Sequence, residues 1–227
     1  GRVISVLGDL ELNGKLSITK DDVKVDFNGY RVKCVSDCIE LVDTYRVHIR
    51  NAFLEGSGSG VGLRITSSNG SKGAMYNKIE NIFMKGFATH LQFDAESPAF
   101  VNVNRIEDVF IELAPGQKGV VLNGNVNGNT FIKVETEGEG AKGFEIDGQD
   151  NIFISPRTID AGSMPSEIKS TAMQTVIVGG YLSNLTDNFL FSLEIFKHMF
   201  LSKITCWNLL LSILFRDLRC CRRDPCF

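Results

Sequence analysis

Two glutamates, Glu80 and Glu107, are the residues whose placement most suggests catalysis. Each directly precedes a recurring four-residue pattern that begins with Asn or Asp, and Arg50 holds the same place one repeat earlier. If the repeats stack as neighbouring strands, about 4.8 Å apart, the two carboxyl groups become neighbours. Carboxyl groups about 5–5.5 Å apart suit a retaining glycosidase, and wider pairs suit an inverting one. We therefore predict that Glu80 and Glu107 are the catalytic pair if the protein is an enzyme.

Cationic side chains accompany these glutamates. His48, Lys78 and Arg105 lie two residues before Arg50, Glu80 and Glu107. We predict that His48, Arg50, Lys78 and Arg105 bind substrate, since an arginine fork fits an anionic sugar or a phosphate. A like-charged neighbour would raise the pKa of one carboxyl, whereas the cations would lower it. The alternative is a solvated ladder of mixed charges on an outward face, where ion pairs are common and weak.

A second polar column follows another set of short apolar segments and contains Thr66, Asp94, Asn123 and Asp147. Asp94 and Asp147 are predicted to contribute to substrate binding. The alternative role is turn formation, which Asp and Asn favour. His90 is expected at the surface, and no cofactor is expected. The cysteines show no paired CxxC spacing and the carboxylates no EF-hand loop, so no metal site is predicted.

A repeated unit must position these side chains. The pattern is Asn or Asp, any residue, an aromatic residue and then usually an aliphatic one. Its first positions are separated by 23, 30, 27, 21 and 22 residues. The pattern occurs as Asn28-Gly29-Tyr30-Arg31, Asn51-Ala52-Phe53-Leu54, Asn81-Ile82-Phe83-Met84, Asp108-Val109-Phe110-Ile111, Asn129-Thr130-Phe131-Ile132 and Asn151-Ile152-Phe153-Ile154.

Each repeat contains a second short strand, and no helical stretch is evident between them. Most of these strands alternate apolar and polar residues with period two, as strands with one buried face do. They are Ile39-Glu40-Leu41, Leu63-Arg64-Ile65, Leu91-Gln92-Phe93, Val120-Val121-Leu122 and Phe144-Glu145-Ile146. Such units bury their apolar faces only by stacking, and their crossovers are right-handed. The sequence thus predicts an all-β chain: a single-stranded, right-handed parallel β-helix, from about residue 10 to about residue 182.

The recurring Asn and Phe residues have a structural explanation. Asn tolerates left-handed backbone at a corner, and stacked amides hydrogen-bond to one another along a ladder. The aromatic residue two positions later is predicted to pack in the core, as large aromatic rings usually do. This prediction covers Phe53, Phe83, Phe110, Phe131 and Phe153. Cys34 and Cys38 are expected to act as small buried apolar residues.

The repeats end near Tyr181 and Leu182. We predict a β-helix domain over residues 1–182 and an atypical, apolar, Cys-rich tail over 183–227. The tail is either a helical cap on the solenoid or an irregular segment that is not the natural end of the domain, for example the product of a shifted reading frame. A membrane anchor is disfavoured, because the cleanest apolar stretch, Ile204 to Phe215, has 12 residues against the roughly 18 to 20 needed. The start at Gly1 without a leader pattern suggests a fragment or a processed product.

Asp22–Tyr30, together with coils such as Asn77–Phe87, resembles the pectate-lyase-like β-helix superfamily, and most of all the tailspike and appendage proteins of bacteriophages. This resemblance implies a homotrimer in the virion or extracellular space that binds host surface polysaccharide or teichoic acid, with or without cleaving it. The sequence departs from polygalacturonases, since it lacks their Asn-Thr-Asp and Gly-His-Gly motifs. A calcium-carboxylate and arginine set of the pectate lyase kind is also missing.

Two further functions stay open beside a glycan-binding depolymerase. One is a non-catalytic structural or adhesive β-helix, and the other is a bacterial pectin or polysaccharide lyase. The formal net charge of −3 gives no support to general nucleic-acid binding. Fold alone does not decide among these chemistries.

Overall fold

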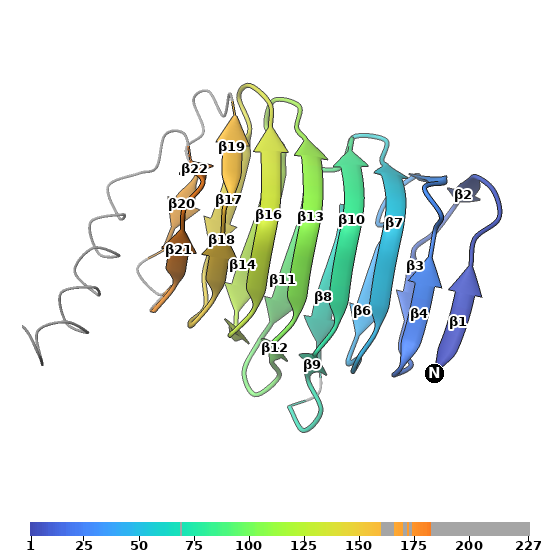
Figure 1. Cartoon of the computed structure of the whole chain (residues 1–227), viewed down its shortest axis with the longest axis horizontal. Helices are drawn as coiled ribbons and strands as arrows, with labels where there is room; N and C mark the ends of the chain where they lie inside the picture. The colour runs from blue at the N-terminus through green and yellow to red at the C-terminus, as the bar shows by residue number, and fades with distance from the viewer. Residues whose placement is uncertain (69, 160–165, 170–171, 173, 183–227) are drawn as a thin grey trace, which may run out of the picture. The chain divides into compact units, whose positions relative to one another are not determined.

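The chain forms a parallel β-solenoid of about seven turns in a computed structural model that describes residues 1–68, 70–159, 166–169, 172 and 174–182. Strands from successive coils lie side by side (Figure 1). The solenoid begins at Arg2, earlier than the sequence pattern indicates, because β1 already pairs with β4. The predicted tail, 183–227, lies outside the described residues.

Three parallel sheets make up the solenoid. The twelve-stranded sheet contains β1 (Arg2–Ser5), β2 (Leu10–Leu12), β4 (Val23–Asp26), β5 (Arg31–Cys34), β7 (His48–Glu55), β10 (Lys78–Lys85), β13 (Arg105–Glu112), β16 (Thr130–Glu137), β18 (Ile152–Ile154), β19 (Arg157–Ile159), β21 (Val176–Val178) and β22 (Tyr181–Leu182). The seven-stranded sheet contains β3 (Leu16–Ile18), β6 (Ile39–Val42), β8 (Val61–Ser67), β11 (Thr89–Ala95), β14 (Lys118–Gly124), β17 (Lys142–Ile146) and β20 (Glu167–Ile168). A short sheet contains β9 (Ala74–Met75), β12 (Val101–Asn102) and β15 (Val126–Asn127).

The core consists of columns of apolar side chains, one from each coil. Ile49, Ile79, Ile106 and Phe131 follow one another in register and are almost wholly buried. The sequence-predicted second strands are confirmed as β6, β8, β11, β14 and β17, and they supply the facing columns. Because each coil adds its apolar side chains to continuing columns, the coils bury their inner faces only by stacking.

Two different asparagine columns exist where the sequence pattern suggests one. Asn51, Asn81 and Asp108 have positive φ angles of 56°, 53° and 52° and form an outer corner in the middle of β7, β10 and β13. Asn129 pairs instead with Asn104, and a buried ladder runs through Asn77, Asn104, Asn129 and Asn151. Placing Asn129 in one column with Asp108 was therefore wrong, because β16 pairs with β13 through Thr130 and Arg105.

The aromatic residues divide in the same way. Phe131 and Phe153 are buried and stack with ring centroids 4.6 Å apart, which confirms the predicted core role for these two. Phe53, Phe83 and Phe110 are only half-buried and point to the outer face, so the prediction that they pack in the core is wrong. The cause is the left-handed corner, which turns the residue directly after it inward and the aromatic residue outward.

Two smaller predictions also need correction. Cys34 and Cys38, both nearly buried, form a disulfide between β5 and the start of β6, so they do more than fill space. His90, expected at the surface, is fully buried on β11. In the part of the chain that the structure describes, no helix has the length and apolar character needed to span a bilayer.

Candidate functional site

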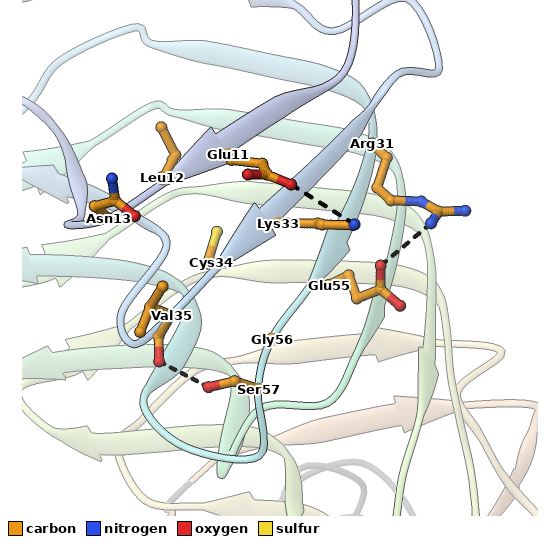
Figure 2. A pocket seen from close by; sticks show the side chains of 10 residues that line it. All are labelled: Glu11, Leu12, Asn13, Arg31, Lys33, Cys34, Val35, Glu55, Gly56 and Ser57. Atoms are coloured by element: carbon orange, nitrogen blue, oxygen red, sulfur yellow. Dashed lines mark hydrogen bonds and ion pairs between the residues drawn. The ribbon is translucent and has the colours of Figure 1, made fainter.

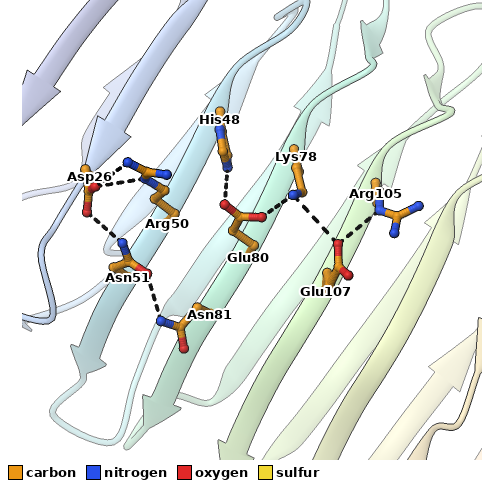
Figure 3. Close-up of polar contacts among 9 residues, drawn as sticks. All are labelled: Asp26, His48, Arg50, Asn51, Lys78, Glu80, Asn81, Arg105 and Glu107. Atoms are coloured by element: carbon orange, nitrogen blue, oxygen red, sulfur yellow. Dashed lines mark hydrogen bonds and ion pairs between the residues drawn. The ribbon is translucent and has the colours of Figure 1, made fainter.

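The outer face of the twelve-stranded sheet carries the predicted catalytic and cationic residues. His48, Lys78 and Arg105 are partners in the strand register, and so are Arg50, Glu80 and Glu107. The two columns predicted from sequence are therefore real, and we call these six residues the charged ladder. Figure 3 shows their side chains on neighbouring strands β7, β10 and β13.

Ion pairs connect most of the charged ladder into one network. His48 Nε2 lies 2.8 Å from Glu80 Oε1, and Lys78 Nζ contacts the other Glu80 oxygen. Lys78 Nζ is also 3.7 Å from Glu107 Oε2, which accepts a hydrogen bond of 3.1 Å from Arg105 Nε. Lys78 therefore lies between the two carboxylates and screens each from the other.

Arg50 does not join this network. Its guanidinium turns to the preceding coil and pairs with Asp26, at 2.7 Å from Nη2 to Oδ2 (Figure 3). Asp26 was missed in the sequence because its coil holds one additional residue, Phe27, before the left-handed corner at Asn28. The strand register, unlike the pattern, places Asp26 beside Arg50 and Lys24 beside His48.

The cations determine the ionisation of both glutamates. Hydrogen bonding to Lys78 lowers the pKa of Glu80, and His48 lowers it further. Partial burial of the carboxyl group opposes both effects. Hydrogen bonding to Arg105 lowers the pKa of Glu107, and the charges of Arg105 and Lys78 lower it further, whereas burial and the Glu80 charge oppose this lowering. Both side chains are therefore carboxylates near neutral pH. A general acid of a glycosidase needs a raised pKa instead.

An aromatic stripe lies beside the charged ladder, further along the same strands. It comprises Phe53, Phe83 and Phe110, with ring centroids 4.8 Å and 5.5 Å apart. Arg31 precedes Phe53 in this column, and its guanidinium carbon lies 5.1 Å from the Phe53 ring centroid. The stripe thus presents partly exposed rings bordered by charged groups across three coils.

A column of alternating charge borders the other side of the stripe. Its members are Glu11, Lys33, Glu55, Lys85 and Glu112, each paired in register with the next. Lys33 lies 3.7 Å from Glu11, and Glu55 contacts both Arg31 and Lys85. Opposite charges on neighbouring strands stabilise a sheet, whereas like charges destabilise it. We call these five residues the alternating column.

Two pockets follow the alternating column. The first has a volume of about 470 Å³, and its lining includes Glu11, Arg31, Lys33 and Glu55 (Figure 2). A second pocket of about 270 Å³ shares Glu55 and Gly56 with it and extends to Lys85 and Glu112. Together they form an open groove of mixed polar and apolar lining that crosses successive coils next to the aromatic stripe.

Asp94 and Asp147 lie elsewhere. Asp94 is on β11 in the seven-stranded sheet, in register with Thr66 and Asn123 as the sequence predicts. Asp147 directly follows β17 and lines a separate pocket of about 210 Å³ with Asn125 and Asn127. The structure thus does not gather Asp94 and Asp147 with Glu80 and Glu107 in one site.

No protein-family model, no curated protein and no solved structure matches this chain. Among the described residues, no group of three or more His, Cys, Asp or Glu side chains is arranged to hold a metal ion. The candidate site is therefore identified from the geometry of the outer face of the twelve-stranded sheet. This face carries the charged ladder, the aromatic stripe and the alternating column.

Proposed function

We propose that the chain binds a cell-surface glycan along the outer face of the twelve-stranded sheet. The aromatic stripe carries this proposal, because Phe53, Phe83 and Phe110 are half-buried side chains in register on an outer face. A sugar ring has an apolar face of C–H groups and a rim of hydroxyls. Aromatic rings pack against the former, while nearby polar side chains orient the latter.

The form of the face favours a chain over a small molecule. The stripe and the groove beside it extend across successive coils instead of closing around one ligand. A linear polymer would contact several coils at once, and each coil would add a similar small contribution to the affinity. The resemblance to phage tailspikes supports a polysaccharide ligand. The Cys34–Cys38 disulfide supports an oxidising compartment such as the extracellular space.

We further propose that this face binds without cleaving. Neither Glu80 nor Glu107 is kept protonated near neutral pH, because the hydrogen bonds from Lys78 and Arg105 lower the pKa of each. Glycoside hydrolysis needs one protonated carboxyl to donate to the leaving oxygen. The same ion pairs join β7, β10 and β13, so these glutamates act as cross-strand contacts.

A binding and cleavage assay on immobilised bacterial surface polysaccharides tests this proposal. We expect the purified full chain to be retained without releasing new reducing ends or unsaturated ends. Glu80→Gln and Glu107→Gln serve as matched variants, and each is expected to remain folded and retained. Chain shortening by the wild type that both variants lose would show that the pair is catalytic after all.

A second measurement separates binding of glycan from packing against protein. The aromatic stripe would equally suit contact with a second copy of the chain. Analytical ultracentrifugation of the wild type and Phe83→Ser distinguishes the two, because only a protein interface predicts self-association that the variant loses. Self-association of this kind, with no retention on any polysaccharide, would refute the proposed function.

A further inference from the structure

Positive and negative charges balance on the six strands that carry the charged ladder, its partner Asp26, the aromatic stripe and the alternating column. On β2, β4, β5, β7, β10 and β13 there are seven cationic residues and seven carboxylates, with His48 counted as neutral. The cations are Lys24, Arg31, Lys33, Arg50, Lys78, Lys85 and Arg105. The carboxylates are Glu11, Asp26, Glu55, Glu80, Glu107, Asp108 and Glu112. These six strands therefore carry no net charge with which to attract an ionic polymer from solution.

These charges also neutralise each other locally. Six of the seven cations, all except Lys24, contact a carboxylate. Arg31 and Lys85 both contact Glu55, at 3.5 Å and 3.2 Å, and both lie over the Phe53 ring. A cation that already faces a carboxylate gains less from pairing with a ligand phosphate or carboxylate, because its charge is already partly neutralised.

An anionic glycan would meet two costs on this face. Each of its charges would approach carboxylates that pair with the cations on the same strand or on a neighbouring one, and like charges repel. At every cation but Lys24 it would also compete with the carboxylate already paired there, such as Asp26, Glu55, Glu80 or Glu107. An uncharged glycan meets neither cost, since its hydroxyls can donate to the free lone pairs of these carboxylates while the ion pairs stay intact.

We propose that the ligand of this face is an uncharged glycan, which would exclude teichoic acid and other anionic polymers. This inference rests on the proposed function and specifies its ligand class. It replaces the expectation from sequence that His48, Arg50, Lys78 and Arg105 hold an anionic sugar or phosphate. Aromatic packing and hydroxyl hydrogen bonds supply the affinity, and the ion pairs keep the groove walls in place.

The experiment compares matched oligosaccharides with the full chain. Neutral hexose oligomers and the same oligomers carrying carboxylate or phosphate groups are titrated at 50 and 500 mM NaCl. We expect the neutral series to bind, with a Kd that changes less than about twofold with salt. An anionic ligand making two charge contacts would lose roughly 30-fold in affinity over this tenfold salt range, as polyelectrolyte binding does.

A charge variant sharpens the comparison. Glu55→Gln leaves Arg31 and Lys85 without their shared carboxylate and gives the face a net positive charge. We expect this variant to bind the anionic oligomers measurably better than the wild type does. Lys85→Gln is the matched control, because it removes a neighbouring charge of opposite sign and is expected to bring no such gain.

The outcomes separate the two proposals. Preference for neutral oligomers with weak salt dependence supports both. Binding of anionic oligomers alone, with steep salt dependence, would overturn the neutral-ligand inference and leave glycan binding standing. Retention of neither series would refute the proposed function and this inference together.

Discussion

At the scale of single residues, the balance between burial and polar partners decides the ionisation of the titratable groups. His90 is fully buried beneath Phe87, with its Nδ1 2.9 Å from the carbonyl oxygen of Lys118. Phe87 N donates to Nε2 at 3.4 Å, so the ring is the neutral tautomer with its proton on Nδ1. Desolvation lowers the pKa of His90 to about 4, against a smaller opposing effect of the Lys118 hydrogen bond.

On the seven-stranded sheet, burial alone would raise the pKa of Glu145. Hydrogen bonds from Lys118 and Lys169 outweigh it and lower that pKa to about 2.

His90 should make the fold sensitive to mild acid. Its folded pKa lies below the unfolded value of 6.5, so its contribution is complete above pH 6.5 and is lost as the pH falls toward 4. We expect about 3 kcal/mol of unfolding free energy to disappear across this window. His90→Gln should lack this part of the pH dependence, measured by urea unfolding at pH 7, 5.5 and 4. The same loss in both proteins would show that His90 is not the responsible group.

At the scale of elements, the strands and their period were predictable from the sequence, but the roles of individual columns were not. The offsets of Lys78 and Glu80 from Asn81 recur at Arg105 and Glu107 because β10 and β13 share one register. Asn129 is followed two residues later by a phenylalanine and then an aliphatic residue, as Asn81 is, yet it lies in the buried ladder. The four-residue pattern does not distinguish these two columns, whereas the φ angle and the strand pairing do. The aromatic stripe was missed as a surface feature for the same reason.

The asparagine ladder should be a major source of coil stability. Asn104 Oδ1 accepts from Asn77 N and Nδ2 at 2.9 Å and 3.0 Å, and its Nδ2 donates to Ala74 and Asn129. Asn104→Ala leaves several buried groups without partners, so we expect a loss of about 3–5 kcal/mol in denaturant unfolding. Asn81 lies at an exposed left-handed corner, where glycine is tolerated, so Asn81→Gly should cost less than about 1 kcal/mol. Equal costs would contradict the ladder's role.

At the scale of the described solenoid, stacking converts single residues into continuous surfaces. Each coil adds one side chain to every column, so the register that aligns the core also aligns the charged ladder, the aromatic stripe and the alternating column. A face of this kind can be extended or changed one coil at a time, because each coil contacts mainly its neighbours. Its binding properties then depend on the columns as wholes, and a ligand must span several coils to use them.

The aromatic stripe is the centre of this account, and calorimetric titration of a neutral oligosaccharide against Phe83→Ala tests it most directly. Phe83 packs between Phe53 and Phe110, so we expect a loss of about 1–2 kcal/mol of binding free energy, roughly 5- to 30-fold in Kd. Tyr76→Ala is the matched control, because Tyr76 is 52% exposed but lies outside the stripe, and its Kd should equal that of the wild type. Circular dichroism should show the same β-sheet content in all three proteins. A folded Phe83→Ala variant that binds as tightly as the wild type would contradict the account.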